Sequence, residues 1–282
     1  MYQIIDGKAV SSYVKQQVKD EVALLAEKGS VPALAVIIVG NDPASKVYVG
    51  NKKKACEMTG MKSIEYALDE NTSEEELLAL IDKLNSDKEV NGILCQLPLP
   101  KHINEDKIID AIAPEKDVDG FSAVNVGKIW LGKYEISPCT PMGVIELLDY
   151  YKIPLEGKNC VIVGRSNIVG KPMAALLLER NATVTVCHSR TKDLASFTKN
   201  ADVIVAAVGR ANFITADMVK DGAVVVDVGI NRLENGKLCG DVDFENVKEK
   251  ASFITPVPGG CGPMTIAVLM KNTLVAYKNQ NK

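Results

Sequence analysis

The sequence predicts an α/β protein of two domains, of which the second has a Rossmann-like parallel sheet. Its length of 282 residues suits about two domains, each large enough for its own core. Both halves alternate apolar, β-branched segments with segments of helix length, which indicates parallel strands joined by helices. The segment NCVIVGRSNIVGKPMAALLLERNATVTVC (159–187) further predicts a strand, a glycine turn, a helix and a second strand.

Three segments of the first half have the composition of strands. They are ALAVIIV (33–39), KSIEYAL (62–68) and VNGILCQ (90–96). Between the last two, TSEEELLALIDKL predicts a helix, because Thr72 and Glu75 have the spacing of a capping box. Another helix is predicted from Pro43 to Gly60, where Gly50 is the one internal glycine.

The second of these helices contains YVGNKKKACE (48–57), with three consecutive lysines. At helical spacing, one face carries the uncharged residues Val47, Tyr48, Asn51, Ala55, Cys56 and Thr59. Lys52 falls on that face, one turn after Tyr48, whereas Lys53 and Lys54 point away from it. Such a lysine commonly lays its methylenes on apolar surface and sends its ammonium to water, and a role in a ligand site is the alternative.

The second half contains four further strand-like segments. They are NCVIVG (159–164), TVTVC (183–187), DVIVAAVG (202–209) and AVVVDVG (223–229). Continuous β-branched runs separated by helices predict parallel strands that are buried on both faces. A final helix follows, with an apolar stripe of Ile266, Leu269, Met270, Thr273, Leu274 and Tyr277.

The domain join is predicted between DVDGF and PCTPMGV, where prolines and glycines accumulate. We expect a first domain at 1–120, a second at 121–262, and a helix at 263–282 that packs back on the first. The loop PVPGGCGP would then lie at an interdomain cleft, where α/β proteins usually bind ligands.

Composition excludes several classes of function. Hydrophobic residues make up 46% of the chain and charged residues 24%, with a net charge of -3 and no long basic tract, which argues against nucleic acid as the main partner. The segment MYQIIDGKAV and the rest of the chain predict neither a signal peptide nor a membrane span. Seven scattered cysteines, with no CxxC spacing, indicate reduced thiols and a cytoplasmic location. Two histidines and no ligand cluster predict no metal site.

The glycine turn predicts a dinucleotide site, although its spacing is not that of GxGxxG. Gly164 and Gly170 enclose five residues, and Pro172 suits the first turn of the helix that follows. An NAD site expects an acid after the next strand, but the chain has Cys187-His188-Ser189-Arg190 there and Arg165 in the turn. Cations with a hydroxyl and no acid favour the 2′-phosphate of NADP, unless both arginines are only surface residues.

Three other segments carry candidate chemistry. GILCQLPLP places Gln96 after a buried strand, at the sheet edge where ligands bind, although it could simply cap the backbone. PEKDVDGF places Asp117 and Asp119 in one turn, and the geometry of an Asx turn explains one acid better than two. PVPGGCGPMT predicts either a helix-entry loop or backbone held close to a ligand.

Taken together, these segments resemble the bifunctional methylenetetrahydrofolate dehydrogenase/methenyltetrahydrofolate cyclohydrolase family. The resemblance extends from near the N-terminus to the last helix. It rests on YVGNKKKACE, GILCQLPLP, PEKDVDGF, PCTPMGV, VIVGRSNIVGKP and ITPVPGGCGPMT, in that order. It implies an N-terminal catalytic domain, an NADP-binding Rossmann domain, a folate cleft between them, tetrahydrofolate one-carbon substrates and a homodimer.

The resemblance also implies roles for individual residues. Lys52 would be catalytic, with Gln96 beside its amine and Tyr48 stacked on the aminobenzoyl ring of folate. Asp119 would bind the pterin. The remaining folate contacts would be Pro258, Gly259, Gly260, Gly262, Pro263 and Thr265, and NADP would be held by Gly164, Arg165, Ser166, Ser189 and Ile230.

The implied reactions are a hydride transfer and a hydrolysis. Hydride transfer from the methylene carbon to NADP mainly needs alignment, whereas hydrolysis of the methenyl cation to 10-formyltetrahydrofolate needs a general acid–base, for which Lys52 is the candidate. Gln96 could face Lys52 through its amide oxygen or its amide nitrogen, and the two orientations imply different protonation states. Two rival functions stay open, another NADP-dependent dehydrogenase and a non-catalytic dinucleotide sensor.

Overall fold

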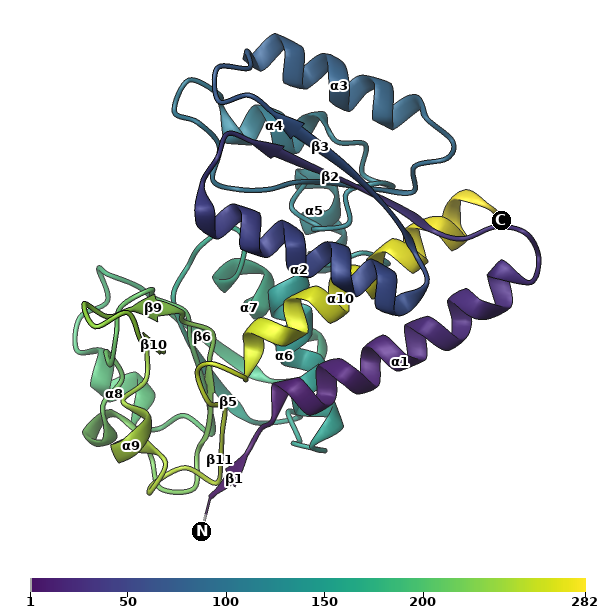
Figure 1. Ribbon diagram of the computed structural model, residues 1–282. Helices are drawn as coiled ribbons and strands as arrows, with labels where there is room; N and C mark the ends of the chain where they lie inside the picture. The colour runs from purple at the N-terminus through teal and green to yellow at the C-terminus, as the bar shows by residue number, and fades with distance from the viewer. Residues whose placement is uncertain (1) are drawn as a thin grey trace. The chain divides into compact units, whose positions relative to one another are not determined.

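The computed structural model describes residues 2–282, which divide into two compact units (Figure 1). Ser12–Cys139 and Ile266–Lys282 form the three-stranded unit, named here after its sheet. Residues 2–11 and Thr140–Thr265 form the six-stranded unit. Both contain parallel strands connected by helices, so the predicted α/β class with a Rossmann-type sheet is confirmed.

In the three-stranded unit, strand β2 (Ala33–Val39) lies between β3 (Lys62–Leu68) and β4 (Gly92–Cys95), and both pairings are parallel. The first two strands have the predicted bounds, and β4 is shorter than the predicted 90–96. Every residue of β2 and β4 is buried, whereas β3, at one edge of the sheet, is partly exposed. The prediction that each strand is buried on both faces was therefore wrong for β3, and it was also wrong for β6 (Thr183–Cys187) of the other unit, where Cys187 alone is buried.

Helix α2 (Pro43–Thr59) begins and ends where the sequence predicted. The Asp42 carboxylate accepts a hydrogen bond from the backbone N–H of Ser45 at 2.7 Å, which caps the helix. Pro43 fits the first turn because it has no N–H to satisfy, and Gly60 ends the helix with a φ of 76°.

The buried face of α2 matches the predicted one at Ala55, Cys56 and Thr59 but not at the other three residues. It consists of Ser45, Val49, Ala55, Cys56 and Thr59, while Val47, Tyr48 and Asn51 are exposed. The prediction was wrong because uncharged residues flank both sides of the face that meets β2 and β3, so residue type alone did not fix its centre. Lys52 lies between Val49 and Cys56 on the buried face and is half-buried, whereas Lys53 and Lys54 are exposed as predicted.

Helix α3 (Glu74–Ser86) has its capping box one residue later than predicted. The Ser73 hydroxyl accepts from the Glu76 backbone N–H at 3.2 Å, and the Glu76 carboxylate accepts from the Ser73 N–H at 2.9 Å. Thr72 and Glu75 have the same spacing, but the Thr72 N–H bonds instead to the Asp69 carbonyl. The helices α4 (Glu105–Ala111) and α5 (Ala123–Trp130) complete this part of the chain.

Helices α1 (Gly7–Ala26) and α10 (Cys261–Gln280) each contribute residues to both units. Within the three-stranded unit, α10 runs alongside α2 and α1 (Figure 1), with Met270 against Cys56 of α2 and Lys278 paired with Glu21 of α1. The predicted stripe of α10 is buried at four positions and half-buried at Ile266 and Tyr277. Burial extends beyond that stripe, to Ala267, Val268, Asn272 and Ala276, because α10 is surrounded by neighbours.

The six-stranded sheet has the order β1-β11-β8-β7-β5-β6, and all of its pairings are parallel. The four predicted strands are β5 (Asn159–Val163), β6 (Thr183–Cys187), β7 (Val203–Ala206) and β8 (Val224–Asp227). Two strands of two residues, β1 (Gln3–Ile4) and β11 (Phe253–Ile254), were not predicted, nor was the ribbon of β9 (Asn231–Arg232) and β10 (Leu238–Cys239).

Helices α6 (Cys139–Tyr150), α7 (Gly170–Glu179), α8 (Leu194–Thr198) and α9 (Phe244–Val247) and the 3-10 turn η1 (Ala216–Met218) connect these strands. The chain passes from β5 to β6 on one side and then to β7 on the other side of β5. Such a change of direction opens a crevice at the carboxyl ends of the strands, which is where doubly wound folds bind ligands.

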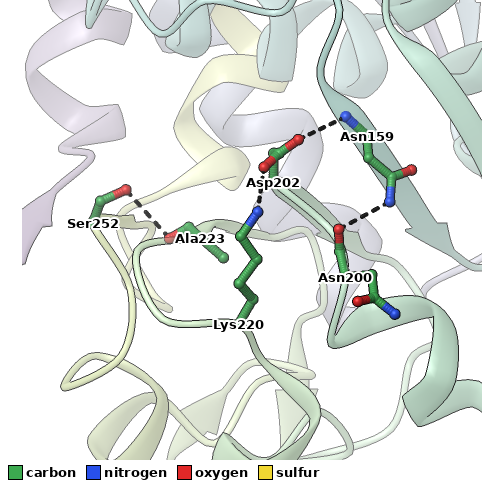
Figure 2. Close-up of polar contacts among 6 residues, drawn as sticks. All are labelled: Asn159, Asn200, Asp202, Lys220, Ala223 and Ser252. Carbon is green, nitrogen blue, oxygen red and sulfur yellow. Dashed lines mark hydrogen bonds and ion pairs between the residues drawn. The ribbon is translucent and has the colours of Figure 1, made fainter.

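The opposite end of this sheet is fixed by polar contacts (Figure 2). The Asp202 carboxylate accepts from the Asn159 backbone N–H at 2.9 Å and pairs with the Lys220 ammonium. The Asn159 side chain donates to the Asn200 carbonyl at 3.0 Å. These contacts join the starts of β5, β7 and β8, so this end stabilises the sheet and leaves the carboxyl ends for ligands.

Two chain-wide predictions can be compared with the structure. All seven cysteines are free thiols, and six are buried while Cys239 is partly exposed. Within the described residues 2–282, no helix combines the length and apolar character needed to span a membrane.

Candidate functional site

Lys52 and Gln96 are in direct contact in the three-stranded unit. Gln96 follows the last residue of β4, and the Lys52 Nζ donates to its Oε1 at 2.8 Å. The Gln96 amide nitrogen donates to the Leu97 carbonyl at 2.6 Å. Because that carbonyl can only accept, it fixes the amide orientation and leaves the oxygen for Lys52. Of the two orientations that the sequence left open, the structure has the amide oxygen toward the lysine.

The Asp117 carboxylate stabilises its own turn through hydrogen bonds. Its carboxylate accepts from the backbone N–H groups of Gly120, Phe121 and Ser122 and from the Asn125 side chain, at 2.8 to 3.3 Å. Four donors satisfy this buried side chain and shape the entry to α5. Turn chemistry therefore accounts for the first acid of PEKDVDGF and not for the second.

Asp119 is the uncommitted acid. Within residues 2–282, its carboxylate has one contact in hydrogen-bonding range, the Cys139 thiol at 3.9 Å. Burial raises the pKa of Asp119 to about 6; the Lys52 charge opposes this rise, and the Asp117 charge adds to it. A half-buried carboxylate that lies near a lysine and lacks N–H donors is suited to receive donors from a ligand.

Cys139 contacts the Asp119 carboxylate, and Asn272 binds the backbone next to it. Neither residue was predicted from the sequence. The Asn272 side chain donates to the carbonyls of Val118 and Ser137 at 2.8 and 2.9 Å. Burial raises the pKa of the Cys139 thiol well above its ordinary value, and the Asp119 charge raises it further, so this thiol remains a neutral donor. The sequence feature that could have indicated this contact was an asparagine among the apolar residues of α10, and this asparagine is buried.

Tyr48 is more exposed than Lys52. It lies one turn before Lys52 on α2, and 47% of its surface is exposed. The exposed ring offers an aromatic face on which a ligand ring could stack.

The glycine turn after β5 is packed so closely that side chains are excluded. A Cβ on Gly164 would lie 2.2 Å from the Ala207 carbonyl oxygen, and the φ of Gly164 is 138°. A Cβ on Gly170 would lie 2.2 Å from the Gly164 carbonyl oxygen. These glycines bring the turn and the first residues of α7 together at the end of the strand, which is the backbone arrangement that a pyrophosphate needs.

The polar residues around this turn fall into two groups. The Ser166 hydroxyl accepts from the Val169 and Gly170 N–H groups at 3.2 and 3.4 Å, so it stabilises the turn that leads into α7. Arg165 and Ser189, which follow the paired strands β5 and β6, are exposed. Within the described residues, the Arg165 guanidinium has no hydrogen-bonding or ionic partner, so it is available to an anion.

A cavity of about 160 Å³ in the six-stranded unit lies between β8 and the loop PVPGGCGP. Ile230 lines it, together with the predicted folate residues Pro258, Gly259, Gly260, Gly262 and Pro263. Thr265 does not line this cavity, and its hydroxyl bonds to that of Thr140 at 2.9 Å. Ile230 is half-exposed, and a Cβ on Gly262 would lie 3.5 Å from its Cδ1. The glycine loop therefore faces the same space as Ile230.

The predicted site residues thus form two sets. Tyr48, Lys52, Gln96 and Asp119 lie in the three-stranded unit, and the predicted cofactor residues and the loop 258–265 lie in the six-stranded unit. Among residues 2–282, no cluster of three or more His, Cys, Asp or Glu side chains could hold a metal ion.

Two family models match the chain along most of its length. Residues 5–119 match the catalytic domain of tetrahydrofolate dehydrogenase/cyclohydrolase, and residues 138–281 match its NAD(P)-binding domain. The chain belongs to the tetrahydrofolate dehydrogenase/cyclohydrolase family. The resemblance found in the six sequence segments is therefore confirmed, and the two sets of site residues lie in the two matched domains.

Individual members of the family are similar over their full length. The bifunctional protein FolD of Campylobacter hominis is 62% identical over 280 residues, which cover 99% of each chain. The crystal structure of a bifunctional FolD dehydrogenase/cyclohydrolase from Campylobacter jejuni is 55% identical, with a TM-score of 0.97 and 99% of both chains covered. A Trypanosoma brucei FolD structure, complexed with NADP cofactor and inhibitor, is 38% identical with a TM-score of 0.95, covering 100% of this chain and 99% of that one.

Proposed function

We propose that this protein oxidises 5,10-methylenetetrahydrofolate to 5,10-methenyltetrahydrofolate with NADP and then hydrolyses the product to 10-formyltetrahydrofolate. The observation that carries the proposal is the hydrogen bond of 2.8 Å from Lys52 Nζ to Gln96 Oε1, with the uncommitted Asp119 nearby. Family membership supports it, as does the Campylobacter jejuni structure, whose name gives both activities.

Lys52 is the proton carrier of the hydrolysis. Water adds to the methenyl carbon, a carbon–nitrogen bond then opens, and protons leave oxygen and arrive at nitrogen. Gln96 fixes the position of the Lys52 Nζ through a hydrogen bond that it accepts, and Leu97 fixes Gln96 in turn. Such an oriented amine can deliver a proton as an ammonium and take one up as an amine.

Folate binding is assigned to Asp119, Tyr48 and the loop 258–265. Among residues 2–282, the Asp119 carboxylate has no backbone donor, which leaves it free to accept from the N–H groups of a pterin. Tyr48 offers an exposed ring for the aminobenzoyl group.

The glycine turn fits a nicotinamide dinucleotide, because Gly164 and Gly170 leave no room for side chains where backbone must approach a pyrophosphate. When bound, NADP accepts the hydride that leaves the methylene carbon. Gly164, Arg165, Ser166, Ser189 and Ile230 would hold it. Arg165 has no partner within the described residues, and residues 188–190, directly after β6, include no acid, which favours the phosphorylated cofactor over NAD.

A substrate screen tests this proposal. The purified protein is incubated with NADP and either 5,10-methylenetetrahydrofolate or a shikimate-type hydroxy acid, and NADPH absorbance is followed; hydrolysis of the methenyl compound is followed separately. We expect activity with the folate substrate alone and hydrolysis without cofactor. Activity only with the hydroxy acid would identify another dehydrogenase, and NADP binding without turnover would identify a dinucleotide sensor.

The homodimeric state is supported by the family resemblance, and the cytoplasmic location by the seven free thiols. Light scattering of the purified protein tests the first, and cell fractionation tests the second.

A further inference from the structure

Two buried carboxylates near the proposed cofactor site have no role in the chemistry proposed above. Asp227 is the last residue of β8 and is 3% exposed, and Asp241, which follows β10, is fully buried. Burying two like charges close together costs free energy unless donors surround them. Burial raises the pKa of Asp227 to about 6, and the Asp241 charge contributes to this rise.

The Asp241 carboxylate binds the backbone of the loop that follows β7. Its Oδ2 accepts from the backbone N–H groups of Val208 and Gly209 at 2.6 and 3.0 Å. Its Oδ1 accepts from the Arg210 N–H and from the Asn231 side chain, both at 2.9 Å. One side chain therefore ties the loop 208–210 to the start of β9.

Asp227 ties the neighbouring loop to Asp241. Its carboxylate accepts from the N–H groups of Gly229, Asp241 and Val242, each at 2.9 Å. The two acids together receive seven hydrogen bonds, six of them from the backbone. They form a continuous connection across the loops 208–210, 228–231 and 240–242.

Two glycines make room for these carboxylates. A Cβ on Gly229 would lie 2.2 Å from the Asp241 Oδ1, and a Cβ on Gly240 would lie 1.8 Å from the Asp227 Oδ2. Neither glycine has a positive φ in the left-handed region, so space and not backbone conformation requires them.

The loops joined in this way are placed where a cofactor would bind. They follow the carboxyl ends of β7 and β8, the sheet edge used for ligands in doubly wound folds. Asp227, Val228, Gly229 and Ile230 also line the cavity opposite the loop PVPGGCGP. Asp227 accepts from the backbone N–H of Gly229 and Asp241 accepts from the Asn231 side chain, so the residues on both sides of Ile230 are held.

We infer that Asp227 and Asp241 are positioning residues of the cofactor site, which set the loops 208–210 and 228–231 at the geometry that receives the nicotinamide dinucleotide. This inference rests on the proposed function. It predicts that weakening the pair affects cofactor binding more than the cofactor-independent hydrolysis.

The test is the variant Asp241→Asn. An asparagine side chain has one accepting oxygen, so its NH2 group must face either Val208 and Gly209 or Arg210 and Asn231. Asp243→Asn is the matched control. Within the described residues, the carboxylate of this nearby acid accepts a single hydrogen bond, from the Asn246 side chain. A second variant, Asn231→Ala, removes a single contact from the partly exposed side of the pair and serves if Asp241→Asn does not fold.

We expect Asp241→Asn to raise the KM for NADP about 10-fold or more, the effect of losing one or two charge-assisted hydrogen bonds. Hydrolysis of the methenyl substrate should stay within about threefold of wild type, and Asn231→Ala should show a smaller change in the same direction. An unchanged KM for NADP in both variants, or an equal loss of both activities, would overturn the inference.

Calorimetric titration of NADP into the same proteins needs no folate substrate. It therefore tests the positioning role even if the wild-type protein fails the folate screen. Weaker NADP binding in Asp241→Asn than in Asp243→Asn supports the inference, and equal binding refutes it.

Discussion

Replacing Asp119 by asparagine should stabilise the fold and weaken folate binding at once. The carboxylate is half-buried with a thiol as its hydrogen-bonding neighbour, and its pKa rises from the ordinary value of 3.8 to about 6, chiefly through burial. Each pKa unit corresponds to about 1.4 kcal/mol, so ionised Asp119 lowers the free energy of unfolding by on the order of 1–3 kcal/mol at neutral pH. The neutral amide of the variant would carry no such charge.

The pH dependence has a definite sign. Between about pH 4 and pH 6, the folded protein holds a proton on Asp119 that the unfolded chain has released. The contribution of this group to stability therefore falls as the pH rises through that window and stays at its lowest value above it. The stability advantage of Asp119→Asn should be full at pH 7.5 and should largely vanish near pH 4.

The assay is urea unfolding of wild type and variant at pH 7.5 and pH 4.5, compared as differences because other carboxylates also titrate. Asp110→Asn, an exposed change on α4, should have little effect, and Asp117→Asn should destabilise by about 1–3 kcal/mol because it disturbs four satisfied donors. The KM for methylenetetrahydrofolate should rise in Asp119→Asn, with NADP affinity nearly unchanged. A variant no more stable than wild type at pH 7.5, or an advantage as large at pH 4.5 as at pH 7.5, would refute the reasoning.

Three further changes test other parts of the site and the fold. Lys52→Met should lower the rate of methenyl hydrolysis by about 10²–10⁴-fold and that of hydride transfer less, because only the hydrolysis needs a proton carrier. Lys53→Met, on the exposed face, is the control. Near wild-type hydrolysis in Lys52→Met would show that Lys52 is not the proton carrier. The double change Arg165→Ala with Ser189→Ala should weaken NADP much more than NAD, by roughly 1–3 kcal/mol per charged contact, and equal losses in steady-state kinetics would contradict phosphate recognition. Ser73→Ala should lower the free energy of unfolding by about 1 kcal/mol through loss of the capping box, as measured by urea unfolding.

The sequence alone determined the features that are encoded by neighbouring residues. Two strands of the three-stranded unit have the predicted bounds, and α2 lies in the predicted segment from Pro43 to Gly60. Periodicity, proline and glycine positions specify such elements because they act through the backbone of the same segment. The six ordered segments also identified the family, since each combines several unusual residues in one short stretch.

Only the tertiary structure decided which groups are free to act. Asp117 and Asp119 are two residues apart in the same turn, but the folded chain supplies donors to one and leaves the other near Lys52. The tertiary structure also fixed the buried face of α2, which residue type had misplaced. Its side-chain contacts fixed the Gln96 amide as well.

The strands β1 and β11 could not be predicted from the sequence, because their pairing also depends on the tertiary structure. Each has two residues, too few for a periodic pattern, and they pair across nearly the whole length of the chain, Gln3 with Phe253. Asp227 and Asp241 were missed because their partners lie on loops that only the fold brings together. Local patterns specify elements, but hydrogen-bond partners that are distant in sequence decide which polar side chains hold the structure and which remain for a ligand.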